Sequence, residues 1–290
     1  MWLSDKWNDF EIIDAGGGEK LERWGNIILC RPDPQVIWNE KSNPSAWRKA
    51  DARYIRSSEG GGHWQFNKNL PESWKIKYED MRFNIKPTGF KHTGLFPEQA
   101  VNWDFIIKKI READRPVKVL NLFAYTGGAT VAAAYAGAEE VVHVDASKGM
   151  VAQAKENVAA SGLGEKYVRF IVDDVLKFAH REERRGRKYD AVIMDPPSYG
   201  RGPGGEIWKF EDELFGLINA CMKILSDRPL FFIINSYTAG ISPTVVSNIL
   251  TLTLKKKWGG AAVSDEIGLP ISSSGLILPC GATSRWTEEP

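Results

Sequence analysis

The fold that we predict for this chain rests on residues 117–128, which read Val117-Lys118-Val119-Leu120-Asn121-Leu122-Phe123-Ala124-Tyr125-Thr126-Gly127-Gly128. The aliphatic start is typical of a short buried strand, and the polar end with two glycines is typical of a tight turn. Residues 129–136 are mostly small and predict a helix. A strand, a turn and a helix in this order hold nucleotide-like ligands at the carboxyl end of a parallel sheet. A tight turn without a ligand explains the two glycines equally well, so the neighbouring sequence must decide.

Strands and helices continue to alternate towards the end of the chain. Further strands are predicted at 140–144, 168–172, 191–194 and 230–235, and helices at 98–111, 148–160, 175–184, 212–225 and 243–256. The alternation predicts an α/β fold with a doubly wound, mostly parallel, Rossmann-like sheet of seven strands. The last two strands, about 261–266 and 276–279, have no helix between them and predict an antiparallel edge.

Residues 1–95 differ from the rest and predict a small β-rich domain ahead of a catalytic domain at 96–290. Short extended runs at 26–30, 35–38, 74–78 and 82–85 are separated by glycine, proline and asparagine. We interpret the tryptophans as packing residues in preference to base-stacking platforms, because aromatic side chains supply burial in small domains; they are Trp2, Trp7, Trp24, Trp38, Trp47, Trp64 and Trp74. A basic face is conceivable from Arg31, Arg48, Lys49, Arg53 and Arg56, but interspersed acids favour an ordinary solvated surface.

Composition limits the function classes. The 290 residues are 43% hydrophobic and carry a net charge of +1, so nucleic-acid contacts would have to come from local patches. Candidates are 181–188 and 255–257, but we favour the interpretation of these runs as solvated helix ends over that of phosphate contacts. The three cysteines form no C-x-x-C pair, which argues against a zinc site and a disulfide framework. No apolar run approaches the roughly 18 residues of a membrane span, and the first ten residues lack an apolar signal core. We therefore predict a cytoplasmic protein without a metal and without a membrane partner.

Three acids follow three successive predicted strands: Asp145, Asp174 and Asp195. In an open α/β sheet these strand ends line the ligand crevice. Asp145 lies at a suitable distance from the glycine turn to bind two ribose hydroxyls, and Asp174 with the Val175 N–H is suited to an adenine ring. Each acid could instead cap a helix, but all three in register favour a binding site.

The glycine turn distinguishes between cofactors. It lacks the G-x-G-x-x-G fingerprint of dinucleotide enzymes and the lysine of a P-loop. A ligand without phosphates is therefore favoured, and S-adenosylmethionine is such a ligand, since it combines adenine and ribose with a carboxylate and a sulfonium.

The segment Asp195-Pro196-Pro197-Ser198-Tyr199 carries the sharpest chemical signal. Two prolines fix the backbone, so that the Asp195 carboxylate and the Pro196 carbonyl can accept both hydrogens of a planar exocyclic amine. The amine lone pair would then face the methyl donor, which is catalysis by positioning, while Tyr199 stacks on the base. Residues 200–205, with Arg201, are predicted to form a mobile lid. The alternative is a proline-rich turn without a catalytic role.

Together these motifs resemble a known family between about residues 83 and 279. The chain is similar to class I S-adenosylmethionine-dependent methyltransferases, and in particular to the bacterial large-subunit ribosomal RNA enzymes of the cytosine-5 and guanine-7 types. The resemblance rests on 93–99 (Thr-Gly-Leu-Phe-Pro-Glu-Gln), 121–128, 144–147, 173–175 and 195–199. It implies a bound S-adenosylmethionine, ribosomal RNA as partner, and recruitment of that RNA by the N-terminal domain.

The resemblance also carries a set of site residues. Those expected at the cofactor are Phe96, Gln99, Asn121, Phe123, Ala124, Tyr125, Thr126, Gly127, Asp145, Ala146, Ser147, Asp174, Val175 and Asp195. Those expected in catalysis are Asp195, Pro196, Pro197 and Tyr199.

One departure bears on the mechanism. Cytosine-5 members of the family carry a cysteine nucleophile just after the fifth strand, where this chain reads Ile234-Asn235-Ser236-Tyr237-Thr238. The favoured function is therefore methylation of a base in ribosomal RNA without a cysteine nucleophile. Methylation of a protein side-chain amide or amine, and a non-catalytic RNA-binding module, are the alternatives. A nicotinamide oxidoreductase is disfavoured by the missing glycine fingerprint.

Overall fold

The computed structural model describes residues 1–57, 61–89, 91–201 and 207–288. The chain forms two compact units, Met1–Val101 with Ile267–Cys280, and Asn102–Glu266 with Gly281–Pro290. The first unit thus takes in a segment from near the C-terminus, in addition to the N-terminal residues that the sequence pattern had separated at residue 95.

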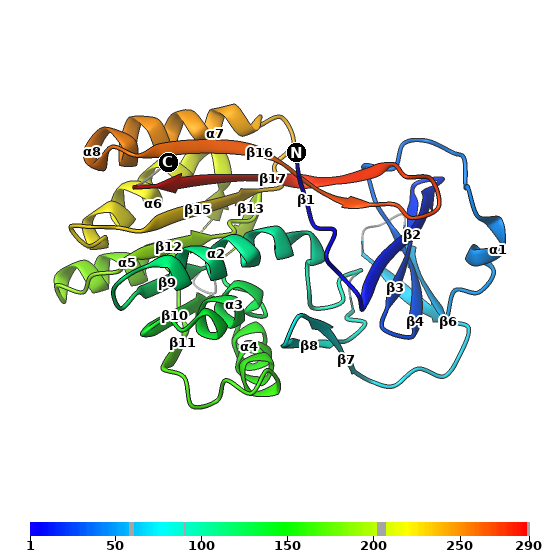
Figure 1. Ribbon diagram of the computed structural model, residues 1–290. Coiled ribbons are helices and arrows are strands. Elements are labelled where there is room, and N and C mark those ends of the chain that lie inside the picture. Colours follow the sequence, from blue (N-terminus) through cyan, green and yellow to red (C-terminus); the bar gives the residue numbers. More distant parts are fainter. Residues whose placement is uncertain (58–60, 90, 202–206, 289–290) are drawn as a thin grey trace. The chain divides into compact units, whose positions relative to one another are not determined.

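The larger unit is built on the expected doubly wound sheet (Figure 1). The strand order of the sheet is β1-β16-β17-β15-β12-β9-β10-β11. The strands are β9 Lys118–Leu122, β10 Glu140–Asp145, β11 Val168–Val172, β12 Ala191–Met194, β15 Phe231–Ser236, β16 Ala261–Pro270 and β17 Ile277–Thr287. Strands β11, β10, β9, β12 and β15 are parallel neighbours, and β17 pairs antiparallel with β15. The predicted parallel sheet with an antiparallel edge is confirmed.

The strand count and the length of the last strands differ from the expectation. A two-residue strand, β1 (Trp2–Leu3), pairs in parallel with β16 at Ile267 and Gly268 and makes the sheet eight-stranded. It is too short to leave an alternating pattern. Strand β17 runs well past residue 279 because its polar residues are hydrogen-bonded inside the unit: Thr283 and Arg285 both donate to the Asn102 Oδ1. A buried polar stretch of this kind does not look like a strand in the sequence.

Helices cover both faces of this sheet. They are α2 Ala100–Glu112, α3 Gly128–Ala136, α4 Lys148–Ala160, α5 Val175–Arg184, α6 Phe210–Ile224, α7 Pro243–Leu250 and α8 Lys256–Trp258. On one face, side chains of α5, α6 and α7 pack against Leu120, Val192 and Phe232 in a continuous apolar core. A 3₁₀ turn, η1 (Pro97–Gln99), precedes α2, and a π-helical turn, η2 (Thr251–Lys255), separates α7 from α8. The predicted helices at 98–111 and 243–256 are therefore each interrupted.

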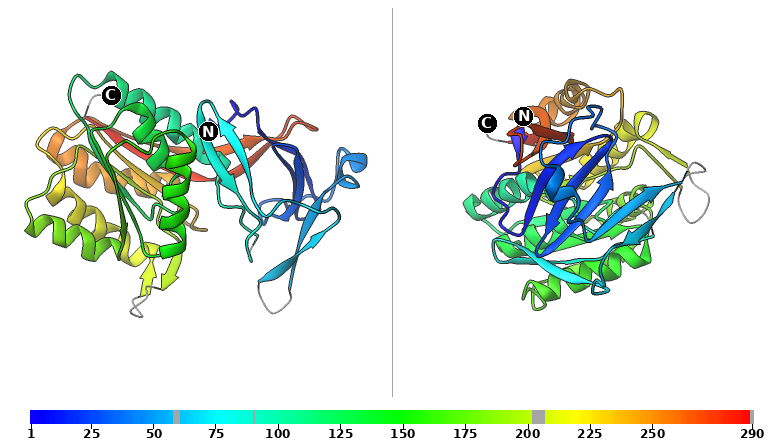
Figure 2. Two further views of the ribbon diagram at one scale, coloured as in Figure 1. Left: turned by 90° about the horizontal axis from the view of Figure 1, so that it is seen from below. Right: turned by 90° about the vertical axis from the view of Figure 1, so that its right-hand side faces the viewer.

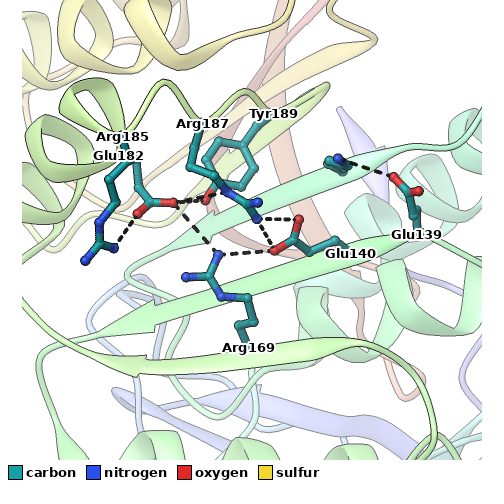
Figure 3. A network of polar contacts seen from close by, with 8 residues as sticks. Glu139, Glu140, Arg169, Glu182, Arg185, Arg187 and Tyr189 are labelled. Carbon is teal, nitrogen blue, oxygen red and sulfur yellow. Dashed lines mark hydrogen bonds and ion pairs between the residues drawn. The ribbon is translucent and has the colours of Figure 1, made fainter.

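The basic segment 181–188 is engaged within the larger unit (Figure 3). Arg187 donates to both carboxylate oxygens of the buried Glu140, at 2.5 and 2.8 Å. Arg185 pairs with the buried Glu182 at 3.0 Å, and Arg181 pairs with Asp173 at 2.6 Å. These contacts join α5 to the residue that follows β11, and join the segment after α5 to β10. They favour a structural role for this segment over that of a phosphate-binding patch.

The first unit contains a five-stranded sheet of order β2-β3-β4-β5-β6 and a separate β7–β8 hairpin. Its elements are β2 Phe10–Gly16, β3 Glu19–Trp24, β4 Ile27–Pro32, α1 Pro44–Trp47, β5 Ala52–Arg56, β6 Gly62–Phe66, β7 Trp74–Tyr78 and β8 Met81–Ile85. The β-rich character is confirmed, but residues 35–38 form no strand. They follow Pro34, and the Val36 N–H closes a turn onto the Asp33 carbonyl.

Most tryptophans of this unit are anchored by their indole nitrogens. The N–H groups of Trp7, Trp24, Trp38, Trp47, Trp64 and Trp74 each donate to a backbone or carboxylate oxygen. Their role in packing therefore agrees with the sequence-based interpretation. Arg31 is not part of a surface, since its guanidinium is buried and donates to Glu22 at 2.6 Å.

Among the described residues, no helix combines the length and the apolar character that crossing a membrane requires. The same residues contain no group of three or more His, Cys, Asp and Glu side chains arranged to hold a metal ion.

Candidate active site

The carboxyl ends of the parallel strands bring the predicted site residues to one edge of the sheet. Leu122 of β9 pairs with Val144 of β10 and with Met194 of β12, and Met194 pairs with Ile234 of β15. The residues that follow these positions therefore lie at the same level along the sheet. They are Phe123, Asp145, Asp195 and Asn235, and Asp174 follows the end of β11 at the same edge.

The turn after β9 is held in an unusual backbone conformation. Phe123 and Tyr125 have φ angles of +52° and +49°, and Gly127 has +84°. Left-handed conformations at residues other than glycine cost about 1–3 kcal/mol each and persist where the surroundings enforce them, often at ligand clamps. The Ala124 N–H donates to the Val144 carbonyl at 3.1 Å, which ties the turn to the end of β10.

Asp145, the last residue of β10, holds the turn after β9 in place. Its Oδ2 accepts from the Tyr125 N–H at 2.9 Å, and its Oδ1 accepts from the Ser147 N–H at 2.8 Å. Burial raises the pKa of the Asp145 carboxyl, and the two N–H groups act in the opposite direction. One carboxylate therefore links the strained turn to the start of α4, where Ser147 is the N-cap and Ala146 is exposed.

A network of buried polar side chains supports the turn after β9. The Asn121 amide donates to the Thr130 Oγ1 at 2.9 Å, and the same Oγ1 lies 2.9 Å from the His143 Nδ1. Burial lowers the pKa of the His143 ring to about 3, so the ring in this contact is neutral near pH 7. The Asn157 amide donates to the Thr126 carbonyl at 2.8 Å. Asn121 thus contributes to the scaffold of the turn through its side chain.

Close packing explains the two glycines of the turn. A Cβ at Gly127 would lie 2.9 Å from the Ala154 Cβ, and a Cβ at Gly128 would lie 2.7 Å from the Trp103 ring. The glycines are therefore required by the approach of α2 and α4 to the turn, a reason that a lone Gly-Gly pair in the sequence does not reveal.

The His143→Asn substitution is expected to reduce the loss in free energy of unfolding that occurs as the pH falls below 6.5. Burial lowers the pKa of His143 from 6.5 to about 3, so the folded state resists protonation that the unfolded state accepts. Stability is then fully present above pH 6.5 and is lost as the pH falls through the window from 6.5 towards 3. Between pH 6.5 and about 4.5 this group alone removes about 2 kcal/mol of the free energy of unfolding.

Urea unfolding of wild type and His143→Asn across this pH window measures the effect. The difference between the two proteins isolates His143 from His92, whose pKa burial lowers to about 4. Parallel pH profiles for both proteins would contradict the assignment of a neutral, buried His143.

Asp174 caps the α5 helix. Its Oδ1 accepts from the Lys177 N–H at 2.9 Å, and the following Val175 is buried. The capping contact that the sequence analysis gave as an alternative is therefore present. Contact of the remaining carboxylate oxygen and of the Val175 N–H with an adenine ring stays a prediction.

The loop after Asp195 is fixed from two sides. The Asp195 N–H donates to the Leu122 carbonyl at 3.3 Å, and Pro196 is buried. The Trp208 indole N–H donates to the Pro197 carbonyl at 2.7 Å, and the Thr238 hydroxyl donates to the Ser198 Oγ at 2.9 Å. Trp208 also meets Phe123 edge-on, with 4.9 Å between ring centroids. This ring contact joins the loop to the turn after β9.

Tyr199 lies in a short hairpin of β13 (Tyr199–Arg201) and β14 (Ile207–Lys209), and half of its surface is exposed. Its ring is therefore accessible for stacking. Residues 202–205 of the predicted lid lie outside the described residues.

Comparison with known proteins identifies the family. A model of the S-adenosylmethionine-dependent methyltransferase family matches residues 45–209. A SAM-dependent methyltransferase from Agrobacterium tumefaciens has a similar crystal structure, with 38% identity, a TM-score of 0.93, and coverage of 99% of this chain and 93% of that one. This chain belongs to the S-adenosylmethionine-dependent methyltransferases. The fold, the family and the cofactor expected from the sequence are confirmed at this level.

Two curated relatives match part of this methyltransferase. Ribosomal RNA large subunit methyltransferase I of Photobacterium profundum is 28% identical over 75% of this chain, and the match covers 50% of the relative. Ribosomal RNA large subunit methyltransferase K/L of Shewanella frigidimarina is 33% identical over 50% of this chain, and the match covers 20% of that relative. The methyltransferase therefore spans half or less of these relatives.

The residues at the sheet edge fit S-adenosylmethionine. The strained turn and the Asp145 carboxylate suit a ribose, and the absence of a P-loop lysine from the turn agrees with a cofactor without phosphates. Phe96 and Gln99 belong to the first unit, where Phe96 precedes η1 with its ring 5.6 Å from that of His92, and Gln99 is buried. Their contact with the cofactor stays a prediction, as do the roles of the other site residues.

Sequence reasoning missed several supporting residues of this methyltransferase. Trp208 and Thr238 fix the loop after Asp195, and Thr130, His143 and Asn157 support the turn. Only His143 left a signal, because a histidine inside an otherwise apolar strand calls for a buried partner.

Replacing Trp208 by Phe is expected to lower kcat about tenfold while leaving S-adenosylmethionine binding intact. The variant keeps an aromatic ring near Phe123 but loses the 2.7 Å hydrogen bond to the Pro197 carbonyl, worth about 1.4 kcal/mol. Steady-state kinetics and calorimetric titration separate the two effects. Thr238→Ser, which retains the hydroxyl, serves as the conservative control at the other anchor. An unchanged kcat in Trp208→Phe would contradict the positioning role.

Proposed function

We propose that this methyltransferase transfers a methyl group to an exocyclic amine nitrogen on a base of ribosomal RNA, without a cysteine nucleophile. The observation that carries the proposal is the Asp195-Pro196-Pro197 loop, which is anchored by Trp208 and Thr238. It follows β12 and lies at the same edge of the sheet as Asp145 and the turn after β9. The names of the two ribosomal RNA methyltransferases that match the chain support RNA as the substrate class.

The residues act mainly by positioning. S-adenosylmethionine, when bound, supplies a methyl group on a positively charged sulfur. The Asp195 carboxylate and the Pro196 carbonyl accept the two amine hydrogens, which orients the nitrogen lone pair towards that methyl group. Transfer of that methyl group would leave the donor sulfur neutral, and the surplus proton of the amine would pass to the Asp195 carboxylate or to water. Tyr199 stacks on the base and fixes its plane.

The cysteines are unsuited to nucleophilic attack. Burial raises the pKa of Cys30 and Cys221 to about 12, and burial also raises the pKa of Cys280. A thiol with such a pKa is almost entirely protonated near neutral pH, and the thiolate is the nucleophile in covalent methyl transfer.

The triple variant Cys30→Ala, Cys221→Ala, Cys280→Ala is therefore expected to keep kcat within about threefold of wild type. Its stability falls because buried side chains are truncated, so activity is measured at a temperature where circular dichroism shows both proteins folded. The three single variants are the controls. A loss of activity in one single variant that remains folded would reveal a cysteine mechanism.

The expected cytoplasmic location and the recruitment of substrate by the domain at 1–95 belong to the same proposal. The test is transfer of labelled methyl groups from S-adenosylmethionine to total RNA and to total protein from a strain that lacks the gene. Label in ribosomal RNA is expected. Label in protein alone would contradict the proposal and favour a side-chain amide or amine as acceptor.

A further inference from the structure

The β5–β6 hairpin of the first unit carries exposed aromatic and basic side chains. Strand β5 is joined to β4 only at Ala52 and Arg53 among the described residues, so the outer part of the hairpin is a two-stranded ribbon. Figure 2 shows this ribbon extending past the neighbouring strands of its own sheet. β6 is the edge strand of that sheet. The hairpin is therefore open to solvent on more than one side.

One face of the hairpin bears a row of aromatic rings, which begins at Phe66 opposite Ala52 and continues into the two-stranded ribbon. Tyr54 and Trp64 are cross-strand partners, and their rings meet edge-on at 5.5 Å. Trp64 and Phe66, two residues apart on β6, are stacked, with ring centroids 6.5 Å apart and 28° between their planes. Tyr54 is buried and Trp64 half-buried, whereas 54% of the Phe66 surface is exposed. The row therefore passes from the core of the unit to an open ring face.

Contacts within the unit hold Tyr54 and Trp64 of this row in place. The Trp64 indole N–H donates to the Thr88 carbonyl at 2.8 Å, which fixes the plane of the ring beside Phe66. Gly62 leaves room for Tyr54, because a Cβ at position 62 would lie 2.7 Å from the Tyr54 ring. A preformed ring stack loses little conformational freedom when a flat ligand joins it, and this favours binding.

The charge of the hairpin complements a polyanion. Residues 52–68 contain Arg53, Arg56 and Lys68, and a single acidic residue, Glu59, between the two strands in the sequence. Arg56 is exposed and lies on the same face as Trp64 and Phe66, because alternate residues of paired strands share a face. Arg53 on the other face lies 3.7 Å from Glu19, and Lys68 pairs with Asp51. Arg56 lies opposite Gly62, at the other end of the row from Phe66, with the Tyr54–Trp64 pair between them. It is therefore placed to bind a phosphate farther along an RNA strand whose base stacks on Phe66.

We propose that this face of the β5–β6 hairpin binds a single-stranded segment of RNA, with a base stacked on Phe66 beside Trp64 and a phosphate bound by Arg56. Aromatic rings and a cation on one surface are the combination that recognises unpaired nucleotides, whose bases offer a flat face for stacking. The choice of RNA over another polyanion rests on the proposed function. The other packed tryptophans keep their structural role, so the platform is confined to the end of one aromatic row.

Binding of a short fluorescent single-stranded RNA of mixed sequence to the full chain, measured by anisotropy, tests this surface. Phe66→Ala is expected to weaken binding fivefold or more, since stacking on an aromatic side chain contributes about 1–3 kcal/mol per base. Arg56→Gln is expected to reduce the slope of log K against log salt by about 0.7, the contribution of one phosphate contact in a single strand. Phe215→Ala, which removes a ring of similar exposure (51%) from α6, is the control and should bind as wild type does.

Several outcomes would overturn the proposal. For the variants, they are unchanged RNA binding by Phe66→Ala, or a weakening by Phe215→Ala equal to that by Phe66→Ala. For the wild type, they are no binding of the single strand, or an affinity for a perfect RNA duplex equal to that for the single strand. A change in oligomeric state without a change in RNA binding would instead assign the face to a second copy of the chain. Methyl transfer to RNA is assayed separately. If Phe66→Ala still methylates RNA and binds it as the wild type does, only the proposal for the hairpin surface is contradicted. If RNA binding depends on the hairpin but only protein is labelled, only the proposed function is contradicted.

Discussion

Asp195→Ala is expected to lower kcat about 100-fold or more while S-adenosylmethionine binding is retained. The carboxylate is one of the two acceptors that orient the amine, and loss of alignment between reacting atoms costs rate on this scale. The turn after β9 is held by the Asp145 carboxylate and by the Val144 carbonyl, and both of these contacts remain in the variant. The cofactor is therefore expected to bind to an intact turn in a protein that no longer aligns the acceptor.

Single-turnover kinetics with saturating cofactor and calorimetric titration of S-adenosylmethionine measure the two properties of Asp195→Ala. Asp212→Asn is the control, because Asp212 lies exposed on the first turn of α6, where its carboxylate is 3.7 Å from the Lys209 ammonium group. Turnover of Asp195→Ala equal to that of the control would exclude Asp195 from catalysis. Loss of cofactor binding together with turnover would assign Asp195 to the cofactor site.

Asp145→Ala is expected to raise the Kd of S-adenosylmethionine about 100-fold. The substitution removes both hydrogen bonds that the carboxylate accepts from Tyr125 and Ser147, and also the proposed contacts with two ribose hydroxyls. Two hydrogen bonds to a charged group, at about 1.5 kcal/mol each, correspond to this loss of affinity. The strained turn also loses its anchor, so Tyr125 is expected to relax from its left-handed conformation.

Titration with S-adenosylmethionine and with 5′-methylthioadenosine separates the causes. Both ligands carry the same ribose, so a ribose contact predicts parallel losses of affinity in Asp145→Ala. Asp173→Asn is the matched control: Asp173 follows the neighbouring strand β11 and pairs with Arg181 at 2.6 Å. Equal effects of the two substitutions would show that charge at the sheet edge, and not the geometry of Asp145, governs binding.

The sequence predicted much of the larger unit because its signals are local. The strand at 117–122 with its glycine turn, the acids at 145, 174 and 195, and the two prolines after Asp195 are each visible within a few residues. Parallel strands then bring these local signals to one edge, since their carboxyl ends meet there. The family and the fold followed correctly from this arrangement.

Features that depend on contacts between distant segments could not be predicted in this way. Trp208 follows Pro197 by eleven residues and Thr238 follows Ser198 by forty, yet both anchor the same loop. Residues 267–280 join the first unit, where the Ser273 hydroxyl donates to Asp14. Strand β17 was predicted too short because its polar residues are buried with partners on α2. Polar side chains in such places look exposed in a sequence, and only the tertiary partner reveals otherwise.

Identification of the methylated nucleoside tests the central claim most directly. RNA labelled by the purified protein is digested to nucleosides, and the labelled nucleoside is analysed by mass spectrometry. The claim predicts a single ribosomal RNA nucleoside with the methyl group on its exocyclic amine nitrogen, formed by wild type and absent from Asp195→Ala. A 5-methylcytosine product, or a product formed equally well by Asp195→Ala, would contradict it.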